Sequence, residues 1–206
     1  MEVKEHTQTI QQNKTVWREQ FMATRMATDQ ATWEAHGQAF LKHAQALSVW
    51  DDATCILAYW PIIARREPDV RPLISWLQEQ GKQIALPVVV NFGRHVSPLG
   101  RMRLAAFDGA EALLPNRWGV LEPHCGPTVL PADLDLVIVP ALGVDRRGYR
   151  IGHGYGYYDE LLASLSVPTI CPTYEATLVD SLPREPHDQR MTYIVTETQV
   201  WQPNRA

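Results

Sequence analysis

Residues 145–159 have the sequence Asp-Arg-Arg-Gly-Tyr-Arg-Ile-Gly-His-Gly-Tyr-Gly-Tyr-Tyr-Asp, and the elements on either side of this segment indicate the fold class. An apolar run rich in Val and Ile, residues 134–142, precedes it and is short enough to form a buried strand. Leu161 and Leu162 open an amphipathic stretch that predicts a helix ending near Leu165. The order of strand, basic glycine-rich loop and helix indicates an α/β fold.

The residue types of this loop suit a bound phosphate. Glycines lack Cβ and let backbone N–H groups approach an anion closely, and the start of the helix adds partial positive charge. Arginine can hold a phosphate through two parallel hydrogen bonds. A carboxylate just beyond, Asp159, suits the magnesium that accompanies a nucleotide. The glycines are Gly152, Gly154 and Gly156, and the basic residues are Arg146, Arg147 and Arg150.

The same loop also has a purely structural interpretation. A single G-x-G-x-G matches neither the dinucleotide-binding fingerprint nor the P-loop pattern. Gly, Tyr and Arg are common in surface loops, and Asp159 can serve as a helix cap. The residues of the loop alone therefore leave both interpretations open.

Length and composition predict a single domain with a core of useful size. The chain has 206 residues, of which 45% are hydrophobic and 20% charged. We expect the polar residues 1–12 to form a flexible tail. A net charge of −4 argues against a protein that binds nucleic acid through its overall charge.

Several features favour a cytoplasmic protein without a membrane partner, and we expect a monomer. The longest apolar stretch, residues 53–64, contains a proline and is far shorter than the roughly 20 residues needed to span a bilayer. The first residues lack the basic start and apolar block of a secretion signal. Cys55, Cys125 and Cys171 are odd in number and widely spaced, which fits reduced thiols.

A helical pattern runs from Asn13 to about Leu47, and we expect two helices joined near Thr32 or Gly37. Asn13 is the predicted N-cap of the first. Lys14 and Arg18, four residues apart, share one helical face. They are either a solvated basic edge or a pair of phosphate ligands.

A strand–helix–strand unit follows, with strands at 53–59 and 82–90 around a helix at 70–80. It predicts a parallel strand pair with a right-handed crossover. Pro87 suggests an edge strand or a bulge. Ligands of such sheets bind beyond the carboxyl ends of the strands, where Glu67 lies on a loop. An exposed carboxylate is the alternative interpretation of Glu67.

Residues 91–133 are not assigned firmly, apart from a short strand at 102–107. Further short strands are expected at 167–171 and 193–196. Asp188 lies in a proline-rich connection, where a surface acid is the commoner interpretation.

Taken together, these segments resemble the 5-formyltetrahydrofolate cyclo-ligase family from about Lys14 to Thr196. The most specific part is Val139-Pro-Ala-Leu-Gly-Val-Asp145 followed by Gly148-x-Arg150-Ile-Gly-x-Gly-x-Gly-Tyr-Tyr-Asp159. Supporting motifs occur in the expected order: Lys14-x-x-x-Arg18, Glu67-Pro-Asp69, Gly81-Lys-x-x-x-x-Pro87, Gly119-Val-Leu-Glu-Pro123 and Leu182-Pro-x-Glu-x-His-Asp188.

The resemblance implies an ATP-dependent ring closure that converts 5-formyltetrahydrofolate to 5,10-methenyltetrahydrofolate, with Mg²⁺ as cofactor. It also implies a three-layer α/β/α fold, with a mostly parallel sheet and an N-terminal helical segment, like that of ribose-5-phosphate isomerase and CoA transferase. A different enzyme that phosphorylates another small amide or formyl compound is one rival interpretation. A non-catalytic folate or nucleotide sensor is the other.

The resemblance also assigns the site, residue by residue. Lys14 and Arg150 are the expected catalytic residues, and Asp159 and Asp188 the expected magnesium ligands. The expected ATP-binding residues are Lys14, Arg18, Arg150, Ile151, Gly152, His153, Gly154, Tyr155, Gly156, Tyr157 and Tyr158. The expected folate-binding residues are Ile62, Glu67, His153, Gly154, Tyr155, Gly156 and Tyr157.

Four residues depart from the family pattern. Tyr155 stands where Gly or a basic residue is usual, Arg65-Arg66 replaces a more neutral segment, and Thr177 replaces a Gln. These changes bear on substrate affinity more than on the fold.

Overall fold

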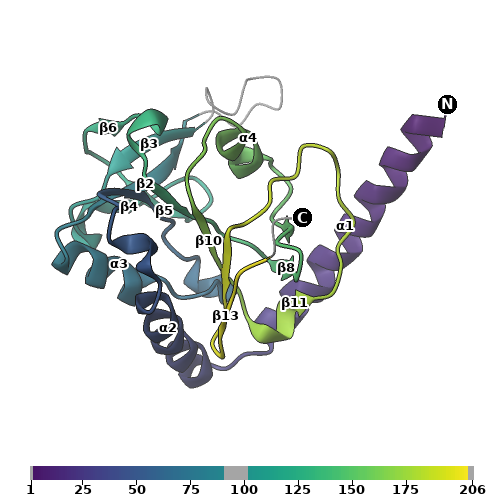
Figure 1. Cartoon of the computed structure of the whole chain (residues 1–206), viewed down its shortest axis with the longest axis horizontal. Coiled ribbons are helices and arrows are strands. Elements are labelled where there is room, and N and C mark those ends of the chain that lie inside the picture. The colour runs from purple at the N-terminus through teal and green to yellow at the C-terminus, as the bar shows by residue number, and fades with distance from the viewer. Residues whose placement is uncertain (1, 91–101, 204–206) are drawn as a thin grey trace.

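The computed structural model describes residues 2–90 and 102–203, with side chains from residue 10 onward. Its centre is an eight-stranded sheet with the order β13-β12-β10-β7-β1-β2-β3-β6 (Figure 1). The strands β12, β10, β7, β1 and β2 are parallel, and β13, β3 and β6 add antiparallel edges. The mostly parallel α/β sheet is therefore confirmed. The bounds are β1 Cys55–Leu57, β2 Gln83–Val89, β3 Met102–Ala106, β6 Thr128–Val129, β7 Leu136–Ile138, β10 Thr169–Pro172, β12 Tyr193–Val195 and β13 Val200–Trp201.

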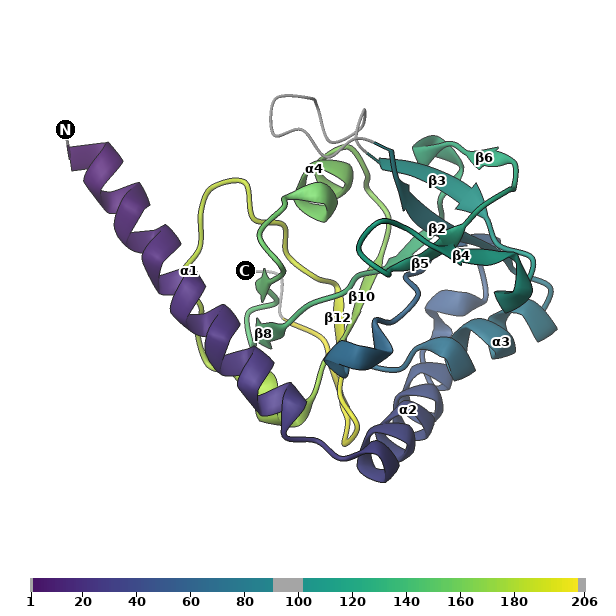
Figure 2. The same ribbon diagram turned by 180° about the vertical axis from the view of Figure 1, so that it is seen from behind.

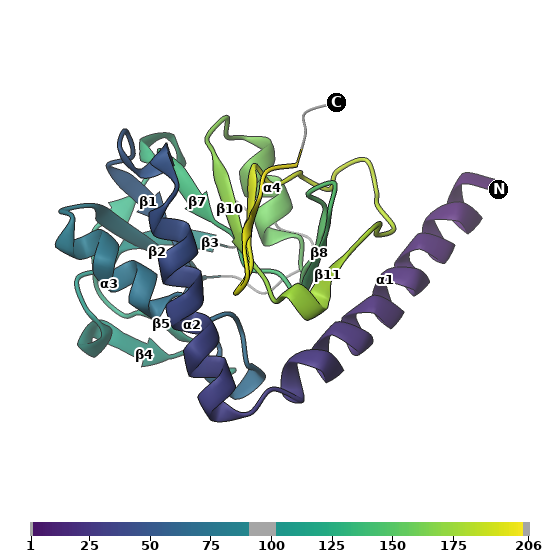
Figure 3. The same cartoon turned by 60° about the horizontal axis from the view of Figure 1, so that its bottom comes forward.

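Helices cover both faces of this sheet. The helices α2 (Gln30–Gln45) and α3 (Arg71–Glu79) pack side by side on one face, and α4 (Tyr157–Ala163) lies on the other (Figure 3). Each face of the sheet has its own apolar core. Alternate residues of a strand contribute to the two cores, because successive side chains point to opposite faces. Ile56 packs with the α2–α3 side, whereas Leu57 packs with the α4 side.

Two small sheets accompany the large one: β4 (Leu113–Pro115) with β5 (Leu121–Pro123), and β11 (Leu178–Val179) with β8 (Gly143–Asp145) and β9 (Arg150–Ile151). The hairpin β8–β9 separates β7 from the glycine-rich loop and was not predicted. Buried Asp145 stabilises the turn of this hairpin, since the Asp145 carboxylate accepts hydrogen bonds from the backbone N–H groups of Arg147, Tyr149 and Leu182. The buried strand predicted at 134–142 is confirmed only in its middle, because β7 spans Leu136–Ile138.

The first helix, α1 (Glu2–Met26), is long, and its N-terminal half extends away from the sheet (Figure 2). Its C-terminal half packs on the three-stranded sheet, where Phe21 contacts Leu142, Ile151 and Leu182 in a separate apolar cluster. Gly143 permits this approach, since a Cβ at that position would overlap the Phe21 ring. One face of the C-terminal half of α1 is therefore fixed against the segment that leads into the glycine-rich loop.

The predicted N-terminal boundary was wrong. Helix α1 begins at Glu2, so Asn13 lies inside it instead of capping it, and the expected tail is helical from Glu2. Glu, Lys and Gln are good helix formers, and Gln11 Nε2 donates a hydrogen bond to Glu185 Oε2 at 2.6 Å. The joint between the helices is also earlier than expected, because Asp29 caps α2 and accepts a hydrogen bond from the backbone of Thr32.

Strand β2 confirms the parallel pair with β1 but not the edge suggested by Pro87. It lies between β1 and β3. The pairing with β1 ends at Ala85, two residues before Pro87, so the proline interrupts no bond to β1. Residues 91–101, part of the segment left unassigned from the sequence, lie outside the described residues.

Candidate active site

Helix α1 presents three basic residues to the carboxyl ends of the strands. Lys14, Arg18 and Arg25 are spaced by four and seven residues, which places them on one stripe of an α-helix. Lys14 and Arg25 are buried and Arg18 is half-buried. A solvated basic edge is therefore the wrong interpretation of Lys14 and Arg18.

Lys14 contacts the acidic loop at residues 182–188, called here the late acidic loop. Its Nζ lies 2.7 Å from Asp188 Oδ2 and 3.0 Å from Glu185 Oε2, and all three side chains are almost fully buried. Burial raises the pKa of the Glu185 carboxyl, but hydrogen bonds from Lys14 and Gln11 outweigh it and bring the pKa below its ordinary value. Sequence reasoning placed Glu185 in the family's acidic motif without giving it a role.

The second predicted metal ligand, Asp159, pairs with Arg150. The distance from Arg150 Nη1 to Asp159 Oδ1 is 3.0 Å. The backbone N–H of Gln189 also donates to Asp159 Oδ1, at 3.2 Å. Because Gln189 follows Asp188 directly, the two predicted metal carboxylates are brought to adjacent parts of the site. Asp159 is not the helix cap, since α4 is preceded by Gly156 and Asp159 lies in its first turn.

These carboxylates fit a divalent cation by their chemistry. Magnesium favours oxygen ligands, with one or two carboxylates beside phosphate oxygens and water. Ligand-type atoms of Glu185, His187 and Asp188 lie within 4.8 Å of one another, so two further candidate donors adjoin Asp188. In the structure the carboxylates are neutralised by Lys14 and Arg150. A bound cation must therefore take over charges that these two basic residues now balance.

The glycine-rich loop contacts the α1 stripe through its backbone. Arg18 Nε donates to the carbonyl oxygen of Gly152 at 3.0 Å. Gly154 has a φ of +91°, and a Cβ there would lie 3.2 Å from the Arg18 guanidinium carbon. Tyr155 is exposed, with its ring stacked on that of Tyr157 at 5.8 Å between centroids. The loop therefore offers its exposed backbone to a ligand beside Arg18.

Two of the predicted loop residues have side chains that face the core. Ile151 is buried in the cluster with Phe21. The hydroxyl of Tyr158 is enclosed without a hydrogen-bond partner among the described residues, and burial raises its pKa. The side chains of these two residues therefore serve the packing of the loop on the core.

Three of the residues expected to bind folate come together. The backbone N–H of Ile62 donates to Glu67 Oε2 at 2.8 Å. His153 Nε2 lies 3.8 Å from Glu67 Oε1. Burial raises the pKa of the Glu67 carboxyl. Burial, with nearby Arg25, lowers the pKa of His153 to about 4, so this imidazole is neutral at pH 7.

Two other arginines of residues 145–159 lie outside the candidate site. Arg146 pairs with Asp180 and stacks over the Trp201 ring, and Arg147 pairs with Asp145. Both belong to the turn between β8 and β9, which sequence reasoning merged with the loop. Conversely, Arg25 was missed, although its position seven residues after Arg18 in a predicted helix places it on the same stripe.

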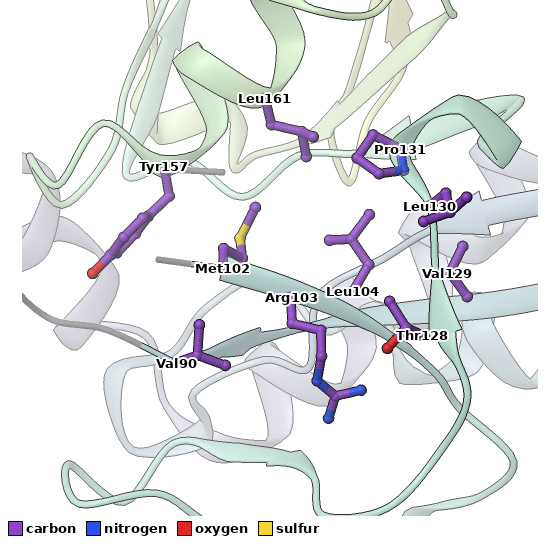
Figure 4. A pocket seen from close by; sticks show the side chains of 10 residues that line it. All are labelled: Val90, Met102, Arg103, Leu104, Thr128, Val129, Leu130, Pro131, Tyr157 and Leu161. Atoms are coloured by element: carbon purple, nitrogen blue, oxygen red, sulfur yellow. The ribbon is translucent and has the colours of Figure 1, made fainter. Parts of the chain in front are cut away.

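A cavity of about 380 Å³ adjoins the loop on the α4 side of the sheet. Tyr157 and Leu161 of α4 face Met102 and Leu104 of β3 across it (Figure 4). Its lining is mostly apolar, with Arg103 and Thr128 as polar exceptions; the other lining residues are Val90, Val129, Leu130 and Pro131. A lining of this kind suits the binding of an apolar ring system.

A parallel sheet with a basic helix stripe, an exposed glycine-rich loop and clustered carboxylates beyond the strand ends is typical of an α/β enzyme with an anion-binding site. Comparison with known proteins is more specific. Residues 10–197 match the 5-formyltetrahydrofolate cyclo-ligase family, and the chain belongs to this family.

The relatives that it resembles carry the same name. A 5-formyltetrahydrofolate cyclo-ligase of Mycolicibacterium smegmatis is 32% identical over 193 residues, covering 89% of this chain and 93% of the relative. That of Escherichia coli K12 is 30% identical over 165 residues, covering 73% of this chain and 88% of the relative.

Solved structures agree in fold. The 5,10-methenyltetrahydrofolate synthetase of Aquifex aeolicus superposes with a TM-score of 0.78 at 25% identity, covering 94% of each chain. The synthetase of Mycoplasma pneumoniae has a TM-score of 0.67 at 23% identity, covering 89% of this chain and 98% of that one. Among the described residues, no helix has the length and apolar character needed to cross a membrane.

Proposed function

We propose that the protein converts 5-formyltetrahydrofolate to 5,10-methenyltetrahydrofolate with ATP and Mg²⁺, releasing ADP and phosphate. The observation that carries the proposal is the convergence of distant segments on one site. Lys14 of α1 reaches Asp188 of the late acidic loop. His153 of the glycine-rich loop approaches Glu67 of the loop after β1. Family membership supplies the substrate.

The reaction has two bond-making steps. The formyl oxygen takes the γ-phosphoryl group of ATP, so that one P–O bond forms as the bond to ADP breaks. The neighbouring N10 then attacks the activated carbon: a C–N bond forms, the N10–H bond breaks as its proton passes to solvent, and the C–O bond to phosphate breaks. Phosphoryl transfer of this kind depends on positioning and charge stabilisation and needs no covalent catalyst from the protein.

The nucleotide side of the site is built from α1 and the loop. Lys14, Arg18 and Arg150 supply full positive charges, and the backbone of residues 152–156 supplies N–H donors. Residues 154–156 are exposed, which supports contact with a ligand. Lys14 and Arg150 would exchange their carboxylate partners for phosphate oxygens as ATP binds.

Asp159 and Asp188 would hold the Mg²⁺. The ion, when bound, neutralises the charge that develops on the β- and γ-phosphate oxygens. The same two carboxylates hold Arg150 and Lys14 in place before that exchange. Before Mg²⁺ binds, the two carboxylates and the two basic side chains thus keep one another ordered.

On the folate side, Glu67 would accept hydrogen bonds from the N–H donors of the pterin ring, and Ile62 would contact the ring. The loop from His153 to Tyr157 would lie between folate and ATP. We also propose a cytoplasmic monomer. Free thiols at Cys55, Cys125 and Cys171 support the reduced compartment.

The direct test mixes purified protein with 5-formyltetrahydrofolate, ATP and Mg²⁺ and follows the near-ultraviolet absorbance of the methenyl product. We expect a rise that requires both ATP and Mg²⁺. The absence of a rise, with ATP binding still seen by calorimetry, would overturn the proposal and favour another phosphorylated substrate or a sensor.

A further inference from the structure

Arg25 is a buried cation to which the family resemblance gave no role. It is 1% exposed. Its Nε donates to the carbonyl oxygen of Arg66 at 3.2 Å and its Nη1 to that of Ala141 at 3.5 Å. It therefore ties α1 to the loops that follow β1 and β7. Its Nη2 lies 3.8 Å from Glu67 Oε1 and has no hydrogen-bond partner among the described residues.

The backbone around Glu67 is fixed by buried side chains. Three aromatic residues donate to consecutive carbonyl oxygens of this loop, in addition to Arg25. These bonds run from Tyr174 to Arg66 at 2.8 Å, from Trp33 to Glu67 at 2.7 Å and from Tyr59 to Pro68 at 3.0 Å. These bonds fix the backbone from which the Glu67 side chain projects.

The two oxygens of that carboxylate are used differently. Oε2 accepts a hydrogen bond from the backbone N–H of Ile62. Oε1 lies 3.8 Å from both Arg25 Nη2 and His153 Nε2, too far for a hydrogen bond to either. Both nitrogens lack hydrogen-bond partners within the described ranges. One acceptor oxygen therefore remains open between two unused polar groups.

We propose that Arg25 is a positioning residue of the folate site. It acts through Glu67, which it keeps as a carboxylate with Oε1 directed to the N–H donors of the pterin ring. This inference rests on the proposed function and adds a residue to its folate side.

The charges around Glu67 support this role. Burial raises the pKa of Glu67, and Arg25 is the foremost group that opposes the rise. Arg65, on the same loop, is exposed and contributes less. His153 is neutral at pH 7, as its pKa is about 4. Glu67 in turn raises the pKa of the nearby hydroxyls of Tyr59, Tyr158 and Tyr174, which are buried and neutral at pH 7. Arg25 is thus the buried cation that the described structure places against Glu67.

The test compares Arg25→Gln, Arg25→Lys, Glu67→Gln and the double variant Arg25→Gln/Glu67→Gln. KM for 5-formyltetrahydrofolate, KM for ATP and kcat are measured from pH 5.5 to 8, with circular dichroism as a check on folding. For Arg25→Gln we expect KM for folate to rise about 10- to 100-fold, because the hydrogen bond from the pterin to a charged Glu67 is lost, with KM for ATP within about twofold.

The pH profile separates charge from packing. Without the cation, the pKa of Glu67 rises, so the acid limb of kcat/KM for folate should move to higher pH in Arg25→Gln. Arg25→Lys keeps the charge and should leave that limb in place while raising KM. In the Glu67→Gln background, Arg25→Gln should add less than about twofold, because the two residues act as one unit.

Equal increases in both KM values, or an unmoved acid limb in Arg25→Gln, would overturn the inference and leave Arg25 a structural residue. If Arg25→Gln does not fold, Arg25→Lys decides: a normal KM for folate in that variant would also overturn it. Wild-type protein without cyclo-ligase turnover would instead refute the proposed function itself.

Discussion

Burial sets the charge state of single residues in this site. His153 is neutral at pH 7 because its pKa is lowered to about 4, whereas the unfolded chain protonates it near pH 6.5. The unfolded state therefore binds more protons between these values, and the contribution of His153 to stability is lost as pH falls from 6.5 to 4.

We expect His153→Asn to reduce this pH dependence. The contribution lost by the wild type over that interval is up to about 3 kcal/mol, from the size of the shift. Urea unfolding at several pH values measures it as the difference between wild type and variant. His124→Asn, at an exposed position, is the control and should follow the wild type. Parallel curves for His153→Asn and wild type would contradict the prediction.

Asp159 carries the metal prediction. Asp159→Asn removes a charged oxygen that the proposed Mg²⁺ needs, so kcat should fall on the order of 10²-fold, as for loss of one electrostatic group at a reaction centre. The Mg²⁺ concentration for half-maximal rate should rise as well. Asp180→Asn is the matched control, since its side chain is 95% exposed. Near-normal turnover of Asp159→Asn would remove the metal role.

At the scale of elements, the glycine-rich loop is shaped by backbone conformation. Gly154 has a φ of +91° and lies against Arg18, whereas a Cβ at Gly152 would meet no atom within 4 Å. Gly154→Ala should therefore lower the free energy of unfolding by about 1–2 kcal/mol. Gly152→Ala should stay within about 0.5 kcal/mol of wild type.

Urea unfolding of the two alanine variants checks this, with KM for ATP as a second readout for Gly154→Ala, which should rise as Arg18 is displaced. Equal stability of the two variants would show that the positive φ at Gly154 imposes no strain.

Phe21 is the buried aromatic side chain that anchors helix α1 and its basic stripe, with Trp17 packed beside it. Phe21→Ala should cost about 3–5 kcal/mol, typical of a buried aromatic truncation. It should also raise KM for both ATP and folate, because Lys14, Arg18 and Arg25 all lie on this helix. Hydrogen exchange of α1 amides should accelerate. Val16→Ala, at an exposed position of the same helix, is the control. Unchanged exchange in Phe21→Ala would show that other contacts hold α1.

On the scale of the whole molecule, the sequence predicted the architecture better than the boundaries. Apolar runs at 53–59 and 82–90 contain β1 and β2, because buried strands require them. The hairpin β8–β9 was missed because its turn depends on Asp145, a buried carboxylate whose partners include residue 182. No local pattern reports such a contact.

The same limit applies to the site. The loop glycines and Glu67 were found through motifs, and the structure brings these segments together. Arg25 and Glu185 were not assigned roles, since their importance comes from burial among distant residues. Arg146 was grouped with the loop from its neighbourhood in sequence, although its side chain pairs with Asp180. Motifs thus locate segments, and packing decides which side chains face the site.

The contact between Lys14 and Asp188 joins residues 174 positions apart. The ribosome synthesises α1 early and the acidic loop late. The Lys14 ammonium and the Phe21 ring therefore lack their native partners while most of the chain is synthesised. A nascent chain that stops short of residue 188 has the glycine-rich loop but lacks Asp188, one of the two proposed metal ligands. The proposed activity can therefore begin only after translation has passed this loop.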